Sequence, residues 1–252
     1  MAEILKVENL TKNFAGLAAV KDVNFELQPR TITGLIGPNG AGKTTMLSII
    51  GGSQPPTSGK ILFAGRNISG LHSYHVARAG IVRTHQIPKP FRSLSVLDNV
   101  LVGLRFGRKH SGSAAGASAP PSPVESRTPM QILEWVGIAH LYRLHASSLS
   151  VGDLKRLELA RALAARPSLL LCDEVCSGLT ESETVAILNL LGEIKRAGTT
   201  ILYVEHNLRA IMSVSQHVIV MNYGQKLAEG PPAEIQNHPA VIEAYIGKSA
   251  EA

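Results

Sequence analysis

Hydrophobic positions in the first third of the chain alternate with polar ones, as they do in strands that are buried on one face. This alternation covers residues 4–7 and 23–27, and "TITGLIG" at 31–37 is a short apolar strand that leads into a glycine-rich turn. A helix over 43–50 follows. Beyond a Pro/Gly turn, "KILFAG" and the segment "GIVRTHQ" from Gly80 predict two more strands. The first part of the chain is therefore predicted to be rich in β-sheet.

From Pro167 onward, continuous apolar runs alternate with segments of helical spacing. The runs are "SLLLC", "TTILYVE" and "HVIVMN", and such strands are typical of a parallel sheet that is covered on both faces. Helices are predicted between the runs, over about 181–196 and 208–214. This part of the chain indicates an α/β core.

Residues 94–165 interrupt that core with a helical segment. The stretches "MQILEWVGIAHLY" and "LSVGDLKRLELARAL" both have helical spacing of apolar residues. In the second stretch the side chains predicted to face inward are Leu154, Leu157, Leu159 and Leu163. Residues 107–129 are rich in Gly, Ser, Ala and Pro without periodicity, and we predict that they form a mobile surface insertion.

The composition narrows the choice of partners. A chain of 252 residues with 44% hydrophobic residues can form one large α/β domain or two small ones, and aromatic residues at 4% supply few platforms for stacking nucleic-acid bases. The net charge of +6 suits an anionic ligand, nucleic acid or a membrane surface. Basic residues are scattered except at Arg105, Arg108 and Lys109, which we interpret as a solvated patch. We predict no nucleic-acid partner.

The cysteines and the amino-terminal sequence bear on the cellular compartment. Cys172 and Cys176 flank an acidic pair, so neither a zinc site nor a structural disulfide is predicted. The opening "MAEILKVENL" has acidic residues and an alternating pattern, unlike a signal peptide, and no run of about 18 apolar residues occurs. We predict a cytosolic protein that reaches a membrane only through a partner.

The segment "GPNGAGKTT" fits the phosphate-binding pattern G-x-x-x-x-G-K-[ST], with Gly37, Gly42, Lys43 and Thr44 at the defined positions. Glycines let the backbone N–H groups converge on phosphate oxygens, and the start of the following helix adds positive potential. Lys43 would bridge the β- and γ-phosphates and Thr44 would bind Mg²⁺. A glycine-rich turn can match by chance, but a strand before it and a helix after it favour the functional interpretation.

An apolar strand, "LLLCDE", ends in Asp173 and Glu174. In P-loop enzymes the aspartate of such a strand holds Mg²⁺, and an adjacent carboxylate can polarise the attacking water. A strand that ends in a solvated acidic turn is the alternative. The phosphate loop favours the catalytic interpretation.

Six motifs together resemble the nucleotide-binding domains of ABC transporters. In chain order they are "GPNGAGKTT", "RTHQ", "LSVGD", "LLLCDE", "SGLT" and "YVEHN". The resemblance covers residues 4–247. It implies an α/β fold with a P-loop NTPase core and parallel sheet (1–93 and 166–252), an N-terminal antiparallel β-subdomain and an inserted α-helical subdomain (94–165), all within one domain, 1–252.

The resemblance also implies the roles of individual residues toward ATP and Mg²⁺. Gln86 would touch Mg²⁺ or the attacking water, Glu174 would act as general base, and His206 would contact the γ-phosphate. Phe14 lies where the family stacks an aromatic ring on adenine, although a core phenylalanine is the alternative. The predicted nucleotide-binding residues are Gly37, Pro38, Asn39, Gly40, Ala41, Gly42, Lys43, Thr44, Thr45, Phe14, Ser150, Gly152 and Asp173, and the predicted metal ligands are Thr44, Gln86 and Asp173.

The segment "LSVGD" is similar to the family signature LSGGQ, whose serine and glycines bind the γ-phosphate held by the opposite subunit. Ser150 and Gly152 match, whereas Val151 and Asp153 depart from the pattern. A carboxylate aimed at a phosphate is unfavourable by about 1 to 4 kcal/mol at ~4 Å, depending on the effective dielectric. We therefore expect Asp153 to point sideways, cap the helix and pair with the neighbouring Lys155 or Arg156.

The segment after the acidic pair departs from the family pattern as well. Val175 stands where many members carry proline, and Thr180 where aspartate or asparagine is usual. The effect of these two departures on turnover is left open.

The carboxy-terminal run "VIVMNYGQKLAEGPPAEIQNHPAVIEAYIG" resembles ATPase subunits of branched-chain amino acid importers and of their relatives for urea and short amides. The resemblance implies two membrane permeases, a second ATPase subunit and, indirectly, an external solute-binding protein. It also implies a peripheral location on the cytoplasmic face of the inner membrane. The region after Gln86, with Phe91 and Arg92, is the expected groove for a permease segment.

Two other functions stay open at this point. One is an ABC ATPase for another transport task, such as lipopolysaccharide extraction, against which the carboxy-terminal run argues. The other is a non-transport ATP-binding regulatory module, against which Lys43, Glu174 and His206 argue. The transported solute and the choice between homodimer and heterodimer are not determined by this sequence.

Overall fold

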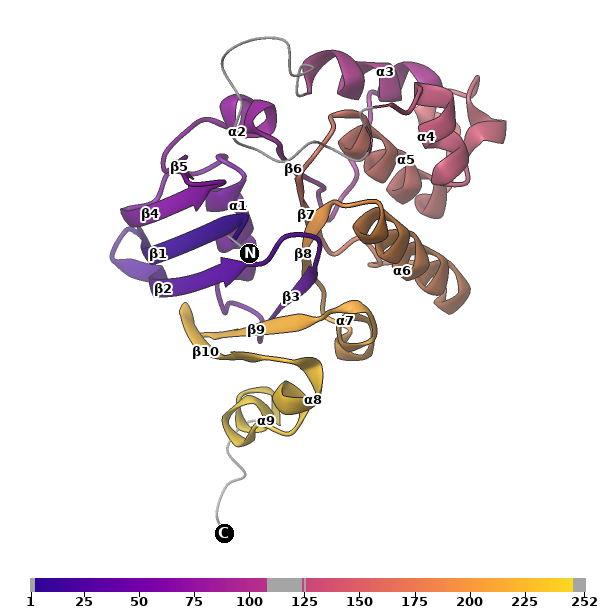
Figure 1. Cartoon of the computed structure of the whole chain (residues 1–252). Coiled ribbons are helices and arrows are strands. Elements are labelled where there is room, and N and C mark those ends of the chain that lie inside the picture. Colours follow the sequence, from indigo (N-terminus) through magenta and orange to yellow (C-terminus); the bar gives the residue numbers. More distant parts are fainter. Residues whose placement is uncertain (1–2, 108–123, 125, 247–252) are drawn as a thin grey trace.

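The computed structural model describes residues 3–107, 124 and 126–246, which form two sheets and surrounding helices (Figure 1). The first sheet, in the order β2-β1-β4-β5, contains β1 (Leu5–Phe14), β2 (Leu17–Leu27), β4 (Ser58–Phe63) and β5 (Arg66–Asn67). The second, in the order β10-β9-β3-β8-β7-β6, contains β3 (Ile32–Ile36), β6 (Ile81–Arg83), β7 (Leu169–Asp173), β8 (Thr200–Val204), β9 (His217–Asn222) and β10 (Gln225–Gly230). The described α-helices are α1 (Lys43–Ile50), α2 (Ser73–Ala79), α3 (Val96–Phe106), α4 (Pro129–Trp135), α5 (Val151–Ala164), α6 (Glu181–Arg196), α7 (Leu208–Val214), α8 (Pro232–Gln236) and α9 (Pro239–Ile246), and short 3-10 helices cover Ala139–Leu141 and Ala146–Ser148.

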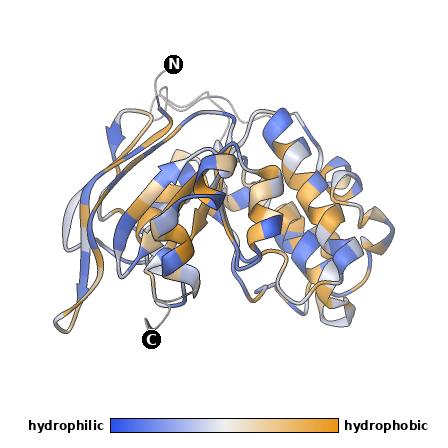
Figure 2. Ribbon diagram, turned by 90° about the horizontal axis from the view of Figure 1, so that it is seen from below, coloured by the Kyte–Doolittle hydropathy of each residue, from blue (hydrophilic) through white to orange (hydrophobic). Residues whose placement is uncertain are grey.

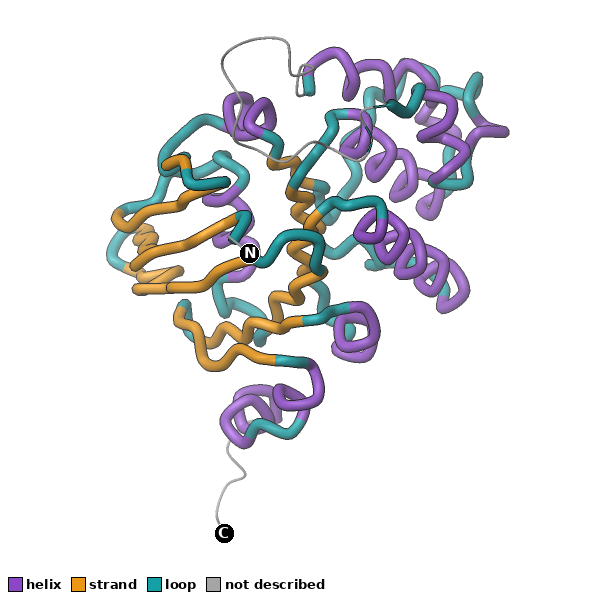
Figure 3. Tube along the Cα trace, viewed as in Figure 1, coloured by secondary structure: helices purple, strands orange, loops and turns teal. Residues whose placement is uncertain are grey.

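Strand direction matches the sequence pattern. The strands of the first sheet pair antiparallel, while β6, β7, β8, β3 and β9 pair parallel and β10 closes the edge antiparallel to β9. Figure 3 shows the antiparallel sheet on one side of the parallel strands and the helices α3 to α6 on the other. The prediction of a parallel sheet beside an antiparallel one is confirmed.

The parallel strands separate two hydrophobic cores. Because side chains alternate between the faces of a strand, Leu169 and Leu171 of β7 pack with the antiparallel sheet and α1, whereas Leu170 and Cys172 pack with α5 and α6. Figure 2 shows apolar residues concentrated in the central strands and on the inner sides of the helices. Burial on both faces explains why β7, β8 and β3 read as continuous apolar runs.

The helices α3, α4 and α5 pack against one another as a group. Ser95, Thr128 and Ser150 stand at their N-caps, where each side chain accepts a backbone N–H of the first turn. The division into a core (1–93 and 166–252) and a helical subdomain (94–165) stays a prediction.

The segment 107–129 is described only in part. Residues 108–123 and 125, which include Arg108 and Lys109 of the basic patch, lie outside the described residues. Val124 is buried in the helical core and Thr128 forms a capping box with Gln131 at the start of α4. Val124 and Thr128 thus contact the rest of the fold, and the mobility of the segment stays a prediction.

Several element boundaries differ from the sequence pattern. Strands β1 and β2 have 10 and 11 residues, longer than the alternating stretches. Register shifts interrupt their pairing, and Asn9 and Asp22 have φ of 48° and 49°, so the bulged strands lose the period-two pattern. Helix α2 buries only Val76 and β10 buries only Gly230, so neither carries a hydrophobic pattern that predicts it.

Candidate nucleotide site

The phosphate loop connects β3 to α1 and packs closely against the backbones of β9 and β2. Gly37 has φ of 151° and Gly42 has φ of 97°, in the region that favours glycine. A Cβ on Gly37 would lie 2.1 Å from the carbonyl oxygen of Met221, and one on Gly42 would lie 2.4 Å from that of Ala19. Both glycines are therefore required by close backbone packing against β9 and β2.

Lys43 is buried inside this loop. Its Nζ donates to the carbonyl oxygens of Gly37 at 2.6 Å and Pro38 at 2.9 Å. Burial lowers the pKa of Lys43, and the carboxylates of Glu174 and Asp173 oppose that shift. The structure thus brings the cation of the loop next to the acidic end of β7.

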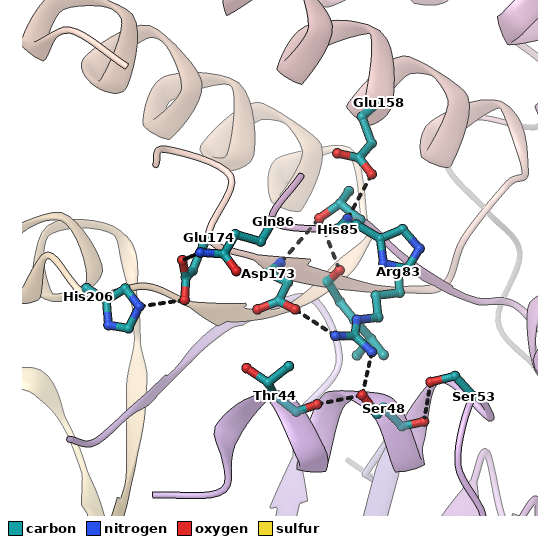
Figure 4. A network of polar contacts seen from close by, with 12 residues as sticks. Thr44, Ser48, Ser53, Arg83, His85, Gln86, Glu158, Asp173, Glu174 and His206 are labelled. Carbon is teal, nitrogen blue, oxygen red and sulfur yellow. Dashed lines mark hydrogen bonds and ion pairs between the residues drawn. The ribbon is translucent and has the colours of Figure 1, made fainter. Parts of the chain in front are cut away.

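Asp173 is held by a residue that the motif analysis missed. Arg83, at the end of β6, donates to Asp173 Oδ2 at 2.7 Å and to the hydroxyl of Ser48 at 2.8 Å, and that hydroxyl donates to the carbonyl oxygen of Thr44 (Figure 4). Arg83 therefore joins β7 to α1, the helix that begins with Lys43 and Thr44. An arginine at the end of an otherwise apolar strand was the available signal.

Glu174 receives two donors from different loops. Gln86 Nε2 lies 2.5 Å from its Oε2, and His206 Nε2 lies 2.5 Å from its Oε1 (Figure 4). The Glu174 side chain is 7% exposed, while that of His206 is 51% exposed. Three residues predicted separately from sequence motifs thus meet in one cluster, beside Lys43 and Asp173.

The backbone of Glu174 is unusual. Its φ is 49°, a left-handed conformation that costs a non-glycine residue free energy and persists only where the surroundings hold it. The N–H of Glu174 donates to the carbonyl oxygen of Val204 at 2.9 Å, and its own carbonyl accepts a bond from Lys155 at 3.0 Å. These bonds hold the residue at both ends.

The signature segment lies at the start of α5. Ser150 is the N-cap: its hydroxyl accepts the backbone N–H of Asp153 at 3.2 Å and donates to the Asp153 carboxylate at 2.6 Å. A Cβ on Gly152 would lie 2.5 Å from Glu183 Oε1 of α6, so any larger residue there would require the Glu183 side chain to move. Within this subunit, Ser150 thus caps α5, and Gly152 in the first turn of α5 faces Glu183 of α6.

One expectation about this helix is wrong. Asp153 pairs with Ser150 rather than with Lys155 or Arg156. Lys155 donates instead to the carbonyl oxygens of Gln86 and Glu174. Arg156 donates to the carbonyl oxygen of Val136 at 2.7 Å. Leu154 is only half-buried, whereas Leu157, Leu159 and Leu163 are fully buried. The inward stripe of α5 instead includes the charged residues Lys155 and Glu158.

Glu158 is a second residue that the motifs did not indicate. It is 7% exposed and accepts the backbone N–H of His85 at 2.8 Å. Burial raises the pKa of Glu158, although the bond from His85 opposes the shift. Glu158 therefore ties α5 to the segment that carries Gln86.

A cavity of about 320 Å³ lies between β6, α3 and α5. Its lining includes Arg83, His85, Lys89, Phe106, Glu158 and Arg161. Phe91 and Arg92, which were expected to line a groove here, are not among the lining residues, but the guanidinium of Arg161 lies 4.9 Å from the centre of the Phe91 ring. The cavity therefore has other lining residues than those expected, and a groove for a permease segment stays a prediction.

Phe14 and the cysteines complete the set of predicted residues. Phe14 is 41% exposed at the end of β1, with Lys12 Nζ 5.0 Å from its ring centre, so it is not a core residue. Cys172 and Cys176 are buried free thiols, and burial raises the pKa of Cys176 to about 11. The thiols belong to the core that contains α5 and α6.

Comparison with known proteins decides the family. The family model for ABC transporters matches residues 20–177, and a model described as branched-chain amino acid ATP-binding cassette transporter matches residues 225–251. This chain belongs to the ABC transporter family. The ATP-binding cassette formed by this chain binds and hydrolyses ATP, and its α/β P-loop NTPase fold is as predicted.

Relatives match the cassette over nearly its whole length. The high-affinity branched-chain amino acid transport ATP-binding protein LivG of Escherichia coli strain K12 is 38% identical over 252 residues, 98% of each chain. The ADP conformation of the cassette MJ1267 is 31% identical with a TM-score of 0.84, covering 98% of this chain and 100% of that one. A dimeric post-hydrolysis cassette, MJ0796 bound to ADP and Pi, is 26% identical with a TM-score of 0.77, covering 90% and 98%.

Among residues 3–107, 124 and 126–246, every helix is too short or too polar to span a bilayer.

Proposed function

We propose that this cassette is the ATP-hydrolysing subunit of an importer for branched-chain amino acids, with Glu174 as its general base. The observation that carries the catalytic part is the convergence of Gln86 and His206 on the Glu174 carboxylate, next to Lys43 and Asp173. The solute class is supported by the match of residues 225–251 and by the full-length similarity to LivG.

ATP binds at the phosphate loop and its phosphates lie along residues 37–45. Lys43 exchanges the carbonyl oxygens of Gly37 and Pro38 for phosphate oxygens, which are better partners for an ammonium group. The N–H groups at the start of α1 face the same anion. The exposed ring of Phe14 stacks on the adenine.

Mg²⁺ fits the oxygen atoms that surround this loop. Thr44, Gln86 and Asp173 would hold it, and hydroxyl, amide and carboxylate oxygens are the ligands that Mg²⁺ prefers. Arg83 bonds to Asp173 Oδ2 and Gln86 uses its amide nitrogen on Glu174, so an oxygen of each side chain is available. When bound, the ion would neutralise charge that develops on the phosphate oxygens.

Hydrolysis follows from the positions of the side chains. Glu174 orients a water molecule and accepts its proton while the water oxygen attacks the γ-phosphorus and the bond to ADP breaks. His206 and Gln86 hold the carboxylate in place, and Lys43 balances charge on the transferred phosphoryl group. The left-handed backbone of Glu174 keeps its side chain directed at this point.

Assembly completes the site. Two cassettes bind head to tail, so that Ser150 and Gly152 of one contact the γ-phosphate held by the other, and the dimeric relative MJ0796 supports this arrangement. Two membrane permeases dock on the cassettes at the cytoplasmic face of the inner membrane, where the cavity between β6, α3 and α5 accepts a permease segment. A solute-binding protein acts on the other side of the membrane.

Uptake measurements test this proposal. Cells that carry Glu174→Gln in an assembled transporter should lose uptake of labelled leucine, isoleucine and valine while urea uptake is unchanged. Loss of urea uptake alone would show that the transported solute is urea or a short amide. Normal uptake of all four would contradict the importer assignment for these solutes, and the assignment as an ATPase would still stand.

A further inference from the structure

Lys155 is a buried cation at the junction of three motifs. It lies in the second turn of α5 and is 3% exposed. Its Nζ donates to the carbonyl oxygen of Gln86 and, at 3.0 Å, to that of Glu174. One ammonium group therefore joins the signature helix, the segment after β6 and the end of β7.

The position is an unfavourable one for a charge. Burial lowers the pKa of Lys155, and the carboxylates of Glu158 and Glu205 oppose the shift. A buried ammonium must be matched by hydrogen bonds, and charge-assisted bonds to two carbonyl oxygens provide them. Leu157 and Leu159 on the same helix are fully buried apolar residues. A cation among them is explained by its two carbonyl partners rather than by packing.

The two carbonyl groups belong to residues whose side chains also meet. Gln86 Nε2 donates to Glu174 Oε2, while Lys155 bonds to the backbone of both. The bond to the Glu174 carbonyl falls on a residue with φ of 49°, whose conformation depends on its surroundings. Removal of the ammonium would take one hydrogen bond from each backbone at once, and would leave Glu174 with its bond to Val204 and the bond that its carbonyl accepts from the Ser177 N–H at 3.1 Å.

We propose that Lys155 is a positioning residue that fixes Gln86 relative to Glu174 and makes their placement depend on the position of α5. The inference rests on the proposed role of Glu174. Ser150 caps the same helix. A displacement of α5 when Ser150 meets the opposite nucleotide is transmitted through Lys155 to the carboxylate that activates water.

The first test compares Lys155 with its neighbour. Arg156 is also a cation of α5 that donates to a carbonyl oxygen, but its partner is Val136 at the end of α4. Lys155→Met should lower kcat by about tenfold or more and leave KM for ATP within about threefold, because misplacement acts on the chemical step. Lys155→Arg should restore most of kcat. Arg156→Met should lower the Tm without changing kcat. Equal losses of kcat in Lys155→Met and Arg156→Met, or a parallel rise in KM, would overturn the proposal.

The second test asks whether Lys155 acts through Glu174. Single-turnover hydrolysis is measured for Glu174→Gln, Lys155→Met and the double variant, each in the full chain. The double variant should be no slower than Glu174→Gln alone, because a residue that acts through another adds nothing once that one is removed. Independent, multiplying effects would refute the positioning role. Near-normal turnover by Glu174→Gln would instead refute the proposed base.

A third variant keeps the proposal testable if Lys155→Met fails to fold. Lys155→Gln keeps N–H donors but is shorter and uncharged, so it cannot serve both carbonyl groups equally. It should bind a fluorescent ATP analogue with nearly normal affinity and show the same selective loss of kcat. Normal kcat in this variant would also overturn the proposal.

Discussion

The hydroxyl of Ser150 donates to the carboxylate of Asp153 at 2.6 Å while accepting the backbone N–H of the same residue at 3.2 Å. A carboxylate therefore holds the proton that the serine would offer to the phosphate on the opposite subunit. The signature LSGGQ, which this segment resembles, has glutamine where Asp153 stands, so an acidic partner for the serine departs from that pattern. It defines a first prediction.

Asp153→Asn should strengthen ATP-dependent dimerisation several-fold, since it removes a negative charge and a competing acceptor near the incoming phosphate. Sedimentation in a Glu174→Gln background measures the dimer constant. Ser150→Ala serves as the control and should weaken the dimer. A dimer constant unchanged by Asp153→Asn would show that the carboxylate does not oppose closure, and a gain of several orders of magnitude would mean that the natural signature is impaired.

Glu174→Gln should bind ATP and dimerise but lower kcat by about a hundredfold or more, because the amide cannot accept the proton of the attacking water. Retention of radiolabelled ATP on the dimer, followed over hours, measures the effect. Rapid release of phosphate by this variant would count against Glu174 as the base.

Arg83→Met should destabilise the fold by about 3 kcal/mol, because it leaves the Asp173 carboxylate buried without its charged partner. Ser48→Ala removes only one hydrogen bond to the same guanidinium and should cost about 1 kcal/mol. Urea unfolding at constant m-value measures both. Equal destabilisation by the two variants would argue that the ion pair contributes little.

The free energy of unfolding of Glu158→Gln should increase relative to that of the natural chain as pH rises. Burial raises the pKa of the folded Glu158 carboxyl above its ordinary value of 4.5, so the folded state retains a proton that the unfolded chain releases. The natural chain therefore loses stability from about pH 4.5 upward, until the raised pKa is passed. Gln keeps an acceptor for the His85 N–H and has no titration. Tm values of both chains from pH 4.5 to 8 test this, and a pH-independent difference would contradict it.

The sequence predicted most of the elements that surround the nucleotide site. Helices α6 and α7 and the strand before the phosphate loop follow from strong periodicity and from continuous apolar runs. Helix α2 and strand β10 could not be predicted, because each buries only one residue and therefore shows no hydrophobic period. Val124 likewise joined the helical core from within a segment without periodicity.

The candidate site divides in the same way. Four of its residues can be recognised in the sequence, because a short motif requires that residue type at that position: Lys43, Gln86, Glu174 and His206. The partners of these residues are not local. Arg83 reaches Asp173 across 90 positions and Lys155 reaches Gln86 across 69 positions, and only the packing of α5 and the parallel strands sets those pairs.

The sequence by itself thus determined which groups can bind phosphate and activate water, since those properties belong to single residues and their neighbours along the chain. Only the tertiary structure decided that Asp153 pairs with Ser150 and that a buried lysine holds Gln86 and Glu174 together. The physical reason is that a polar side chain on a helix can reach several possible partners, and the sequence does not say which of them it bonds to. Burial chooses among them, by removing water and leaving each polar group the partner that the fold supplies.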